Sequence, residues 1–223
     1  MNILSNVSKK FLTTSNSALL LFVIFIIFIV PFFPIEMHKF LYTVSYTIIF
    51  LLSALALSNY RSKIFNLAVI VIVIEWISDI LNLTTLIGIS LVVNICFFLL
   101  IVTLLIRQIA QAKKVTPHVI MESINGYLML GLAFSILIAL VCAIDPTAYS
   151  FKHLSDKMDP SVSYSSNYIY FGFVTLTTLG YGDIAPLTPV AKSLSNFISV
   201  AGQMYVAIII AALVSKYLGQ KNG

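Results

Sequence analysis

The stretch "TLTTLGYGDIAP", residues 175–186, places two glycines and an aspartate beside three threonines. The chain around it consists mostly of Leu, Ile, Val and Phe. Of its 223 residues, 60% are hydrophobic and 9% charged, and the mean hydropathy is +1.02. In soluble domains about a quarter of the residues are charged. The composition therefore predicts a membrane protein, in which residues 175–186 are too polar to form part of an ordinary membrane span.

Six apolar runs are long enough to cross a bilayer as helices, which takes about 20 residues each. They cover residues 17–33, 40–58, 64–82, 84–106, 119–143 and 192–217. The first run resembles a secretory signal, but it ends in "PFFP" without a small-residue cleavage site, so we treat it as a span. The fold class that we expect is an all-α membrane protein with six transmembrane helices in one bundle.

The basic residues predict the orientation of these spans, because cytoplasmic segments carry an excess of Lys and Arg. With the N-terminus in the cytoplasm, nine basic residues lie inside: Lys9, Lys10, Arg61, Lys63, Arg107, Lys113, Lys114, Lys216 and Lys221. Four lie outside: Lys39, Lys152, Lys157 and Lys192. We therefore expect a multi-pass protein of the cell membrane with both termini cytoplasmic. The net charge of +5 then reflects membrane topology, and no nucleic-acid partner is expected.

The segment between the fifth and sixth runs differs from the other connections. A polar loop at 145–160 contains two Asp-Pro breakers, and residues 163–178 after it are apolar and aromatic but too short to cross. This pattern predicts a re-entrant helix that ends at membrane depth. Non-helical backbone is tolerated there only where it is buried in protein or lines a water-filled path.

An extended strand at residues 178–181 would present successive carbonyl oxygens on one side if right-handed and left-handed backbone conformations alternate. Glycine adopts the left-handed conformation at little steric cost, and Gly180 and Gly182 have the spacing required. At about 3.3 Å per residue, four residues span roughly 13 Å, less than half the hydrocarbon thickness. The remainder of such a path would be a wider cavity.

"TTLGYGD" at 177–183, the aromatic segment before it and "AGQMYVAIIIAALV" at 201–214 after it resemble the potassium channel family. The resemblance covers about residues 119–218, and six of the seven positions of the selectivity-filter signature fit. At the seventh, Leu179, the family more often has Val or Ile. The resemblance implies that a potassium ion exchanges its hydration shell for backbone carbonyls and the Thr178 hydroxyl. The implied ion-binding residues are Thr178, Leu179, Gly180 and Tyr181, with K⁺ as the permeant ion and no cofactor.

The resemblance also implies roles for the neighbouring residues. Thr177, Gly182 and Asp183 would support the filter and form its outer mouth, where Asp183 either raises the local cation concentration or braces the filter by a hydrogen bond. The ring of Tyr181 would pack on Tyr170 or Phe171.

In the sixth run, Gly202 is either a hinge of the inner helix or a small residue for helix packing. Gate candidates follow it on the same helix. They are Val206, Ile209, Ile210 and Leu213.

The expected organisation has five parts. They are a cytoplasmic N-terminus (1–16), a four-helix transmembrane bundle (17–106), a cytoplasmic basic connector (107–118), a pore domain (119–218) and a short cytoplasmic tail (219–223). The connector either contacts anionic lipid or is a solvated positive-inside loop. Thr116 and Pro117 suit the N-cap and first position of the fifth helix.

The four-helix bundle matches a voltage sensor in number of spans but lacks its charges. A voltage sensor needs an Arg-rich ladder within a span, and the fourth run has no basic residue before Arg107. In the third run, Glu75 and Asp79 lie four residues apart on one helical face. They are either structural countercharges or part of the gating device, and Asn94 of the fourth run is expected at the depth of Glu75.

From these features we expect a potassium-selective channel, not strongly voltage-gated, that works in the lipid bilayer as a homotetramer with three further copies of itself. The alternatives are a poorly selective cation channel and a non-conducting or regulatory membrane subunit that keeps the pore fold. The sequence contains no nucleophile paired with a base, no phosphate-cradling loop and no cluster of metal ligands, so no enzymatic activity is expected.

Overall fold

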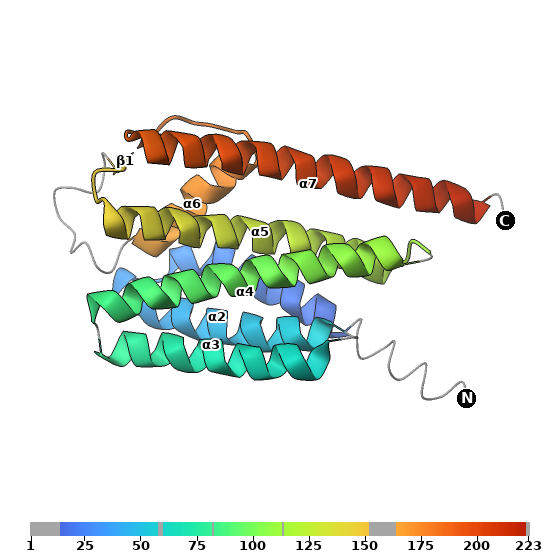
Figure 1. Ribbon diagram of the computed structural model, residues 1–223, viewed down its shortest axis with the longest axis horizontal. Helices are drawn as coiled ribbons and strands as arrows, with labels where there is room; N and C mark the ends of the chain where they lie inside the picture. The colour runs from blue at the N-terminus through green and yellow to red at the C-terminus, as the bar shows by residue number, and fades with distance from the viewer. Residues whose placement is uncertain (1–13, 58–59, 82, 113, 152–163, 222–223) are drawn as a thin grey trace.

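The computed structural model describes residues 14–57, 60–81, 83–112, 114–151 and 164–221, and nearly all of them are helical. Among these described residues, six helices are long and apolar enough to cross a membrane. Figure 1 shows how they are arranged. They are Thr14–Phe32, Ile35–Ala56, Arg61–Leu81, Thr85–Gln111, Pro117–Ile144 and Pro189–Gln220. The six predicted spans are confirmed, and all six helices are longer than the predicted apolar runs, because polar residues at the ends continue the helices.

The first helix changes its winding near its end, which the sequence analysis did not predict. Residues 14–24 are α-helical, and a π-helical turn η1 (Phe25–Ile29) and a 3₁₀ turn η2 (Val30–Phe32) follow. Pro31 lies in η2 and is the physical cause. Proline has no backbone N–H, and its ring clashes with the carbonyl four residues earlier, so regular α-helical hydrogen bonds are lost there.

Three helices form a bundle beside the first: α2 (Ile35–Ala56), α3 (Arg61–Leu81) and α4 (Thr84–Gln111). In Figure 1 α3 lies at one edge of the molecule and α4 lies between α2 and α5 (Pro117–Ile144). The core between α2 and α4 is aromatic. Phe50 packs edge-to-face on Phe97 and Phe98 with ring centroids 4.8 and 5.4 Å apart, an arrangement that adds to the gain from burial.

The connection between α4 and α5 is shorter than the predicted connector. Residues 107–111 continue α4 and residues 117–118 begin α5, so only 112–116 lie between the helices. Arg107, Gln108 and the alanines after them are good helix formers with no breaker among them, which explains the longer α4. Thr116 is the N-cap of α5 and accepts a hydrogen bond from the Val119 amide at 3.4 Å, with Pro117 at the first position. Both assignments agree with the prediction.

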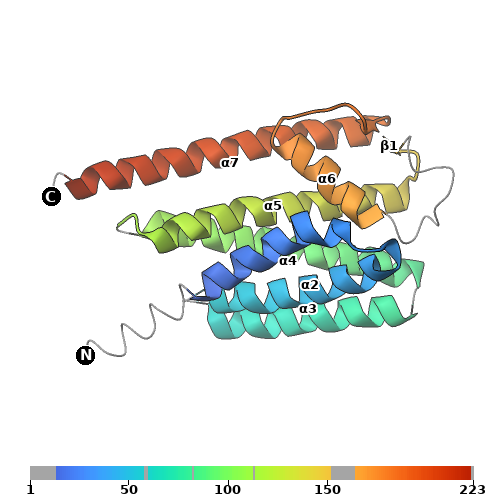
Figure 2. The same cartoon turned by 180° about the vertical axis from the view of Figure 1, so that it is seen from behind.

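The second half of the chain contains a short helix held between two long ones. The helix α6 (Tyr164–Leu176) has 13 residues and slants between α5 and α7 (Pro189–Lys221), as Figure 2 shows. At 1.5 Å per residue it is about 20 Å long, too short to cross. The strand β1 (Tyr149–Ser150) pairs antiparallel with β2 (Ala185–Pro186) and ties the segment before α6 to the segment after the glycines.

Some of the predicted parts lie outside the described residues. These are residues 1–13 of the N-terminus, 152–160 of the outer loop, the first residue of the predicted re-entrant helix at 163 and residues 222–223 of the tail. Residues 219–221 of the predicted tail are helical and belong to α7.

The helix α7 is covered less by its own chain than any other long helix. Within its most apolar window 22% of residues are buried, against 56% in α5. It packs on α6 and α5 along one side. The other side exposes large apolar side chains, among them Phe197, Val200, Met204, Ile208 and Ile210. This surface is suited to lipid or to other copies of the chain.

Candidate ion pathway

Four backbone hydrogen bonds join residues 177–180 to the last turn of α6. The Thr177 and Thr178 amides donate to the carbonyls of Phe173 and Thr175 at 2.9 and 3.0 Å. The amides of Leu179 and Gly180 both donate to the carbonyl of Val174, at 2.9 and 3.3 Å. These bonds satisfy carbonyls that a helix end leaves open. They also hold the start of the glycine-containing segment against the last turn of α6.

The backbone then alternates in handedness, as the glycine spacing predicts. Gly180 has φ +59° and Gly182 has φ +77°. Thr178 also has a positive φ of 60°, which the sequence analysis did not predict because this residue carries a side chain. The left-handed conformation costs a non-glycine residue about 1 to 2 kcal/mol. Strain of this kind is typical of functional sites, where the surrounding structure imposes it.

The segment 177–183 is exposed in the single chain, and Leu179 and Tyr181 have 56% and 67% of their surface exposed. Within the single chain, no ring contact joins Tyr181 to Phe171, one of its two predicted partners. Phe171 is buried and packs edge-to-face on Tyr149, with ring centroids 5.1 Å apart. The physical reason is the pairing of β1 with β2, which places Tyr149 over this face of α6. The chain itself leaves most of the Tyr181 ring uncovered.

Tyr170, the other predicted partner of Tyr181, contacts the outer end of the segment. Its hydroxyl donates a hydrogen bond of 2.6 Å to the Asp183 carboxylate. This bond raises the pKa of Tyr170, so its phenol stays protonated and remains a donor at neutral pH. The contact supports the bracing interpretation of Asp183. It joins the middle of α6 to the residue that follows the second glycine.

Gly202 lies where α7 crosses the end of α6. A methyl group added at this glycine would meet the backbone carbonyl and the side chain of Leu176. The helix α7 is unbroken from Pro189 to Lys221. Ser199, one turn earlier, donates a hydrogen bond of 3.1 Å to the carbonyl of Thr175. Of the two predicted roles, this geometry supports close helix packing against the end of α6.

The four gate candidates on α7 do not share one environment. Val206 and Ile210 are exposed and Leu213 is half-buried, whereas Ile209 is 7% exposed and packs in the core of its own chain. Ile209 therefore lies on a different side of α7 from Ile210. Helical spacing alone does not tell which side faces the rest of the fold.

A tyrosine that the sequence analysis missed fixes α7 to α5. The hydroxyl of Tyr205 donates a hydrogen bond of 2.9 Å to the carbonyl of Ser123, and its ring lies 5.7 Å from that of Tyr127. Gly126 provides the space, because a methyl group there would meet the Tyr205 side chain. Gly126 lies within an apolar span, and this is the sequence signal from which a close contact could have been predicted, although not its partner.

A polar cluster joins the first helix, the end of α4 and the start of α5. Glu122 is almost fully buried, accepts a hydrogen bond from Gln108 and lies 3.3 Å from Nδ1 of His118. Nε2 of His118 is 3.0 Å from the amide of Asn16, and Asn125 donates to the Asn16 carbonyl at 3.0 Å. The sequence analysis missed this cluster, because its members come from three separate spans.

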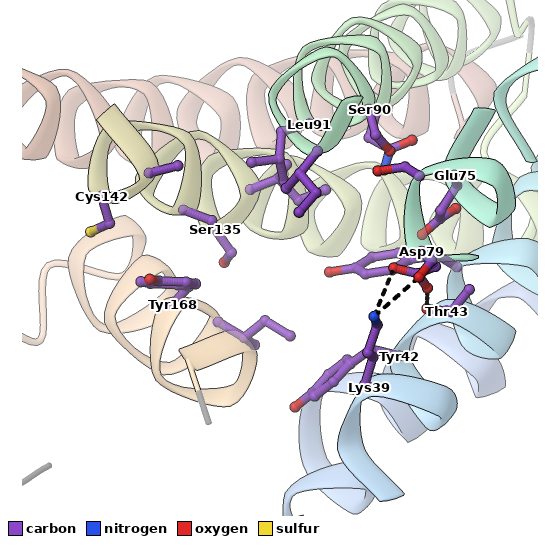
Figure 3. A pocket seen from close by; sticks show the side chains of 18 of the residues that line it. Lys39, Tyr42, Thr43, Glu75, Asp79, Ser90, Leu91, Ser135, Cys142 and Tyr168 are labelled. Atoms are coloured by element: carbon purple, nitrogen blue, oxygen red, sulfur yellow. Dashed lines mark hydrogen bonds and ion pairs between the residues drawn. The ribbon is translucent and has the colours of Figure 1, made fainter. Parts of the chain in front are cut away.

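Glu75 and Asp79 line one cavity together with Asn94, as their predicted depth implied. Figure 3 shows the two carboxyl groups in this cavity. Asp79 accepts a hydrogen bond of 2.6 Å from Thr43 and forms an ion pair of 3.8 Å with Lys39. Glu75 is 7% exposed. No group of three or more His, Cys, Asp or Glu side chains that could hold a metal occurs among the described residues.

Comparison with known proteins finds similarity to ion channels. Residues 136–218 match a family model described as "Ion channel". A 50-residue segment is 46% identical to "Two pore potassium channel c" of Oryza sativa subsp. japonica, and covers 22% of this chain and 11% of that protein. A 56-residue segment is 50% identical to "Potassium channel K1" of Plasmodium berghei, and covers 25% of this chain and 3% of that protein.

A 67-residue segment is 30% identical to "Potassium voltage-gated channel subfamily A member 10" of Homo sapiens, and covers 29% of this chain and 13% of that protein. The chain thus aligns with only a small part of the length of each of these curated relatives. No solved structure was found to match the chain significantly.

Proposed function

We propose that this chain, which belongs to the potassium channel family, conducts potassium ions passively through a pore built from several copies. The observation that carries the proposal is the alternation of handedness at Thr178, Gly180 and Gly182, directly after the short helix α6. In an extended strand this alternation turns successive carbonyl oxygens to one side, which is the arrangement that replaces the hydration shell of a cation.

The electrostatics around this strand also favour a cation. The carboxyl end of a helix carries a partial negative charge, and α6 ends at Leu176, immediately before the strand. At the other end Asp183 supplies a full negative charge at the outer mouth. Carbonyls of Thr178, Leu179, Gly180 and Tyr181, with the hydroxyl of Thr178 innermost, are the proposed ligands. They act as a substitute for solvent and need no cofactor.

Ion flux through the purified protein in liposomes tests this proposal. We expect potassium uptake that barium blocks, and reversal potentials in mixed potassium and sodium solutions that show potassium and rubidium permeating far better than sodium. The reason is that the ligands are fixed backbone oxygens and not hydrated side chains. Equal permeability for sodium would favour a poorly selective cation channel. Absence of flux would favour a non-conducting subunit.

The assembly that we propose is a homotetramer with the strands at 178–181 around a fourfold axis. Each chain has one copy of the filter signature, so several chains are needed to enclose an ion in rings of oxygens. The exposed apolar side of α7 and the uncovered ring of Tyr181 are surfaces for neighbouring copies to cover.

Native mass spectrometry of the detergent-solubilised protein is expected to give the mass of four chains. Flux measured on the same preparation connects the assembly to the activity. A monomer or dimer that conducts would contradict the tetramer.

We further propose that the open probability changes only gently with voltage. Moving one charge through the full membrane field is worth about 2.3 kcal/mol per 100 mV, and steep gating takes three or four such charges per subunit. In α4 the first basic residue is Arg107, close to the end of the helix at Gln111. Glu75 is nearly buried, and Asp79 is paired with Lys39.

Single-channel recording over a range of about 200 mV checks this expectation, since gating by three or four charges would be steep within such a range. Recordings of Arg107→Gln are expected to resemble those of the unchanged protein. A steep sigmoidal response that flattens in Arg107→Gln or in Glu75→Gln would show that the bundle senses voltage.

A further inference from the structure

A cavity lies between the four-helix bundle and the pore half, away from residues 177–183. It is a cavity of about 810 Å³, of the size of sites that take small organic molecules. In Figure 3 Glu75, Asp79 and Thr43 lie on its bundle side, and Ser135, Cys142 and Tyr168 lie across from them. An occupant would therefore contact the bundle and the pore helices α5 and α6 at once.

Of the two carboxyl groups that line this cavity, one has a cationic partner among the described residues and the other has none. Asp79 is neutralised by Lys39 at 3.8 Å and accepts a hydrogen bond from Thr43. The second carboxylate, Glu75, is 7% exposed, and its Oε2 has no hydrogen-bond partner among the described residues. A buried carboxylate oxygen without a partner is costly, and a hydrogen-bond donor or a cation bound in the cavity would relieve that cost.

A second acceptor in the cavity is also unpaired. Asn94 is 5% exposed, and its side-chain Oδ1 has no partner among the described residues. Glu75 Oε2 and Asn94 Oδ1 are both acceptors, and a carboxylate favours a donor that carries one positive charge. The hydroxyls of Tyr42 and Tyr149, which also line the cavity, have no partner among the described residues and can donate or accept. A primary ammonium, with three N–H donors and one charge, matches this requirement.

The rest of the lining suits the body of an organic molecule better than a bare ion. Aromatic rings surround the cavity and provide apolar contact and cation–π attraction. They are Tyr42, Tyr46, Tyr149, Phe151 and Tyr168. Ile87, Leu91, Ile136 and Ile169 add apolar surface. A hydrated metal ion would leave most of this surface without a partner.

We propose that this cavity binds a primary alkylammonium group, with Glu75 as its countercharge and Asn94 as a second acceptor. Such a group occurs both in free organic amines and in the headgroup of aminolipids. Because the cavity is lined both by the bundle and by α5 and α6, binding there would change how the bundle holds the pore helices. The site is independent of the proposed ion conduction, and its binding is measured without flux.

The test is isothermal titration calorimetry of the full chain in detergent. The probe is 2-phenylethylammonium, and 2-phenylethanol is the neutral control of nearly the same shape. We expect the alcohol to bind at least tenfold more weakly. Glu75→Gln is expected to weaken binding of the cation at least tenfold. Glu36→Gln removes an exposed carboxylate outside the cavity and is expected to leave the affinity unchanged.

A second variant keeps the test valid if Glu75→Gln fails to fold. Leu91→Phe leaves the charge in place and fills part of the cavity, so it is expected to weaken binding through loss of space. Equal affinity for the cation in the wild type and in both of these variants would overturn the proposal. Equal affinity for the alcohol and the ammonium would overturn the role of Glu75.

A second experiment, in lipid vesicles, distinguishes a free amine from an aminolipid as the source of the ammonium group. The protein is placed in phosphatidylglycerol vesicles with or without phosphatidylethanolamine, and the probe is titrated into each. Competition by phosphatidylethanolamine, with a lipid adduct in native mass spectra that is lost in Glu75→Gln, assigns the site to an aminolipid. Probe binding without competition assigns it to a free amine. Neither probe binding nor a lipid adduct in the wild type would overturn the proposal.

Discussion

Replacing Gly180 with alanine is expected to abolish potassium flux while leaving the fold almost intact. Gly180 has φ +59°, and a methyl group built there meets no atom of its own chain within 4 Å. The effect of the substitution is therefore conformational and not a clash. Holding alanine in the left-handed region costs about 1 to 2 kcal/mol in each chain.

Four chains must adopt the conducting conformation together in the proposed pore. The penalty then sums to about 4 to 8 kcal/mol, which lowers the population of the conducting state about a thousandfold or more. Each single chain loses little, so its melting temperature is expected to fall by only a few degrees. Potassium flux in liposomes and the thermal unfolding of the same preparation are the two measurements.

Gly88→Ala is the matched control for this experiment. Gly88 lies in α4, where a methyl group also meets no atom within 4 Å, and its φ is not positive. It is expected to conduct normally and to be slightly more stable, since alanine favours the helix. Normal flux through Gly180→Ala would mean that the left-handed backbone at 180 is not needed for conduction.

Replacing Gly202 with alanine is expected to destabilise the folded protein. The added methyl group would meet the carbonyl oxygen of Leu176, a backbone atom that cannot move without shifting the end of α6. Overpacking of this kind costs typically about 1 to 3 kcal/mol. In an ordinary helix the same substitution stabilises by up to about 1 kcal/mol. A decrease in the free energy of unfolding of Gly202→Ala would therefore identify the close contact. Thermal unfolding in detergent measures it.

Gly219→Ala on the same helix α7 is the control, because its added methyl group meets nothing within 4 Å. It is expected to be neutral or slightly stabilising. Flux measurements separate the two interpretations of Gly202. If Gly202→Ala has an unchanged melting temperature and a reduced open probability, Gly202 acts as a hinge and the packing interpretation is wrong.

The sequence determined those features that depend on local chemistry along the chain. Six spans follow from the length of their apolar runs, because a helix must satisfy its backbone internally to cross a bilayer. The short helix α6 was predictable because residues 163–178 are apolar but too few to cross. The left-handed backbone at Gly180 and Gly182 followed from glycine alone, since only a residue without a Cβ adopts it at little cost.

The tertiary structure decided features that depend on which residues meet across the fold. The left-handed Thr178 is imposed by its surroundings, because its own side chain opposes that conformation. The carbonyl of Leu176 beside Gly202, the separation of Ile209 from Ile210, and the cavity around Glu75 all arise from the way in which distant helices pack. Apolar helices in a membrane can pack on several faces with similar energy, because lipid tails are as apolar as leucine. Hydropathy therefore locates the spans, whereas specific steric and hydrogen-bond contacts select the faces that meet.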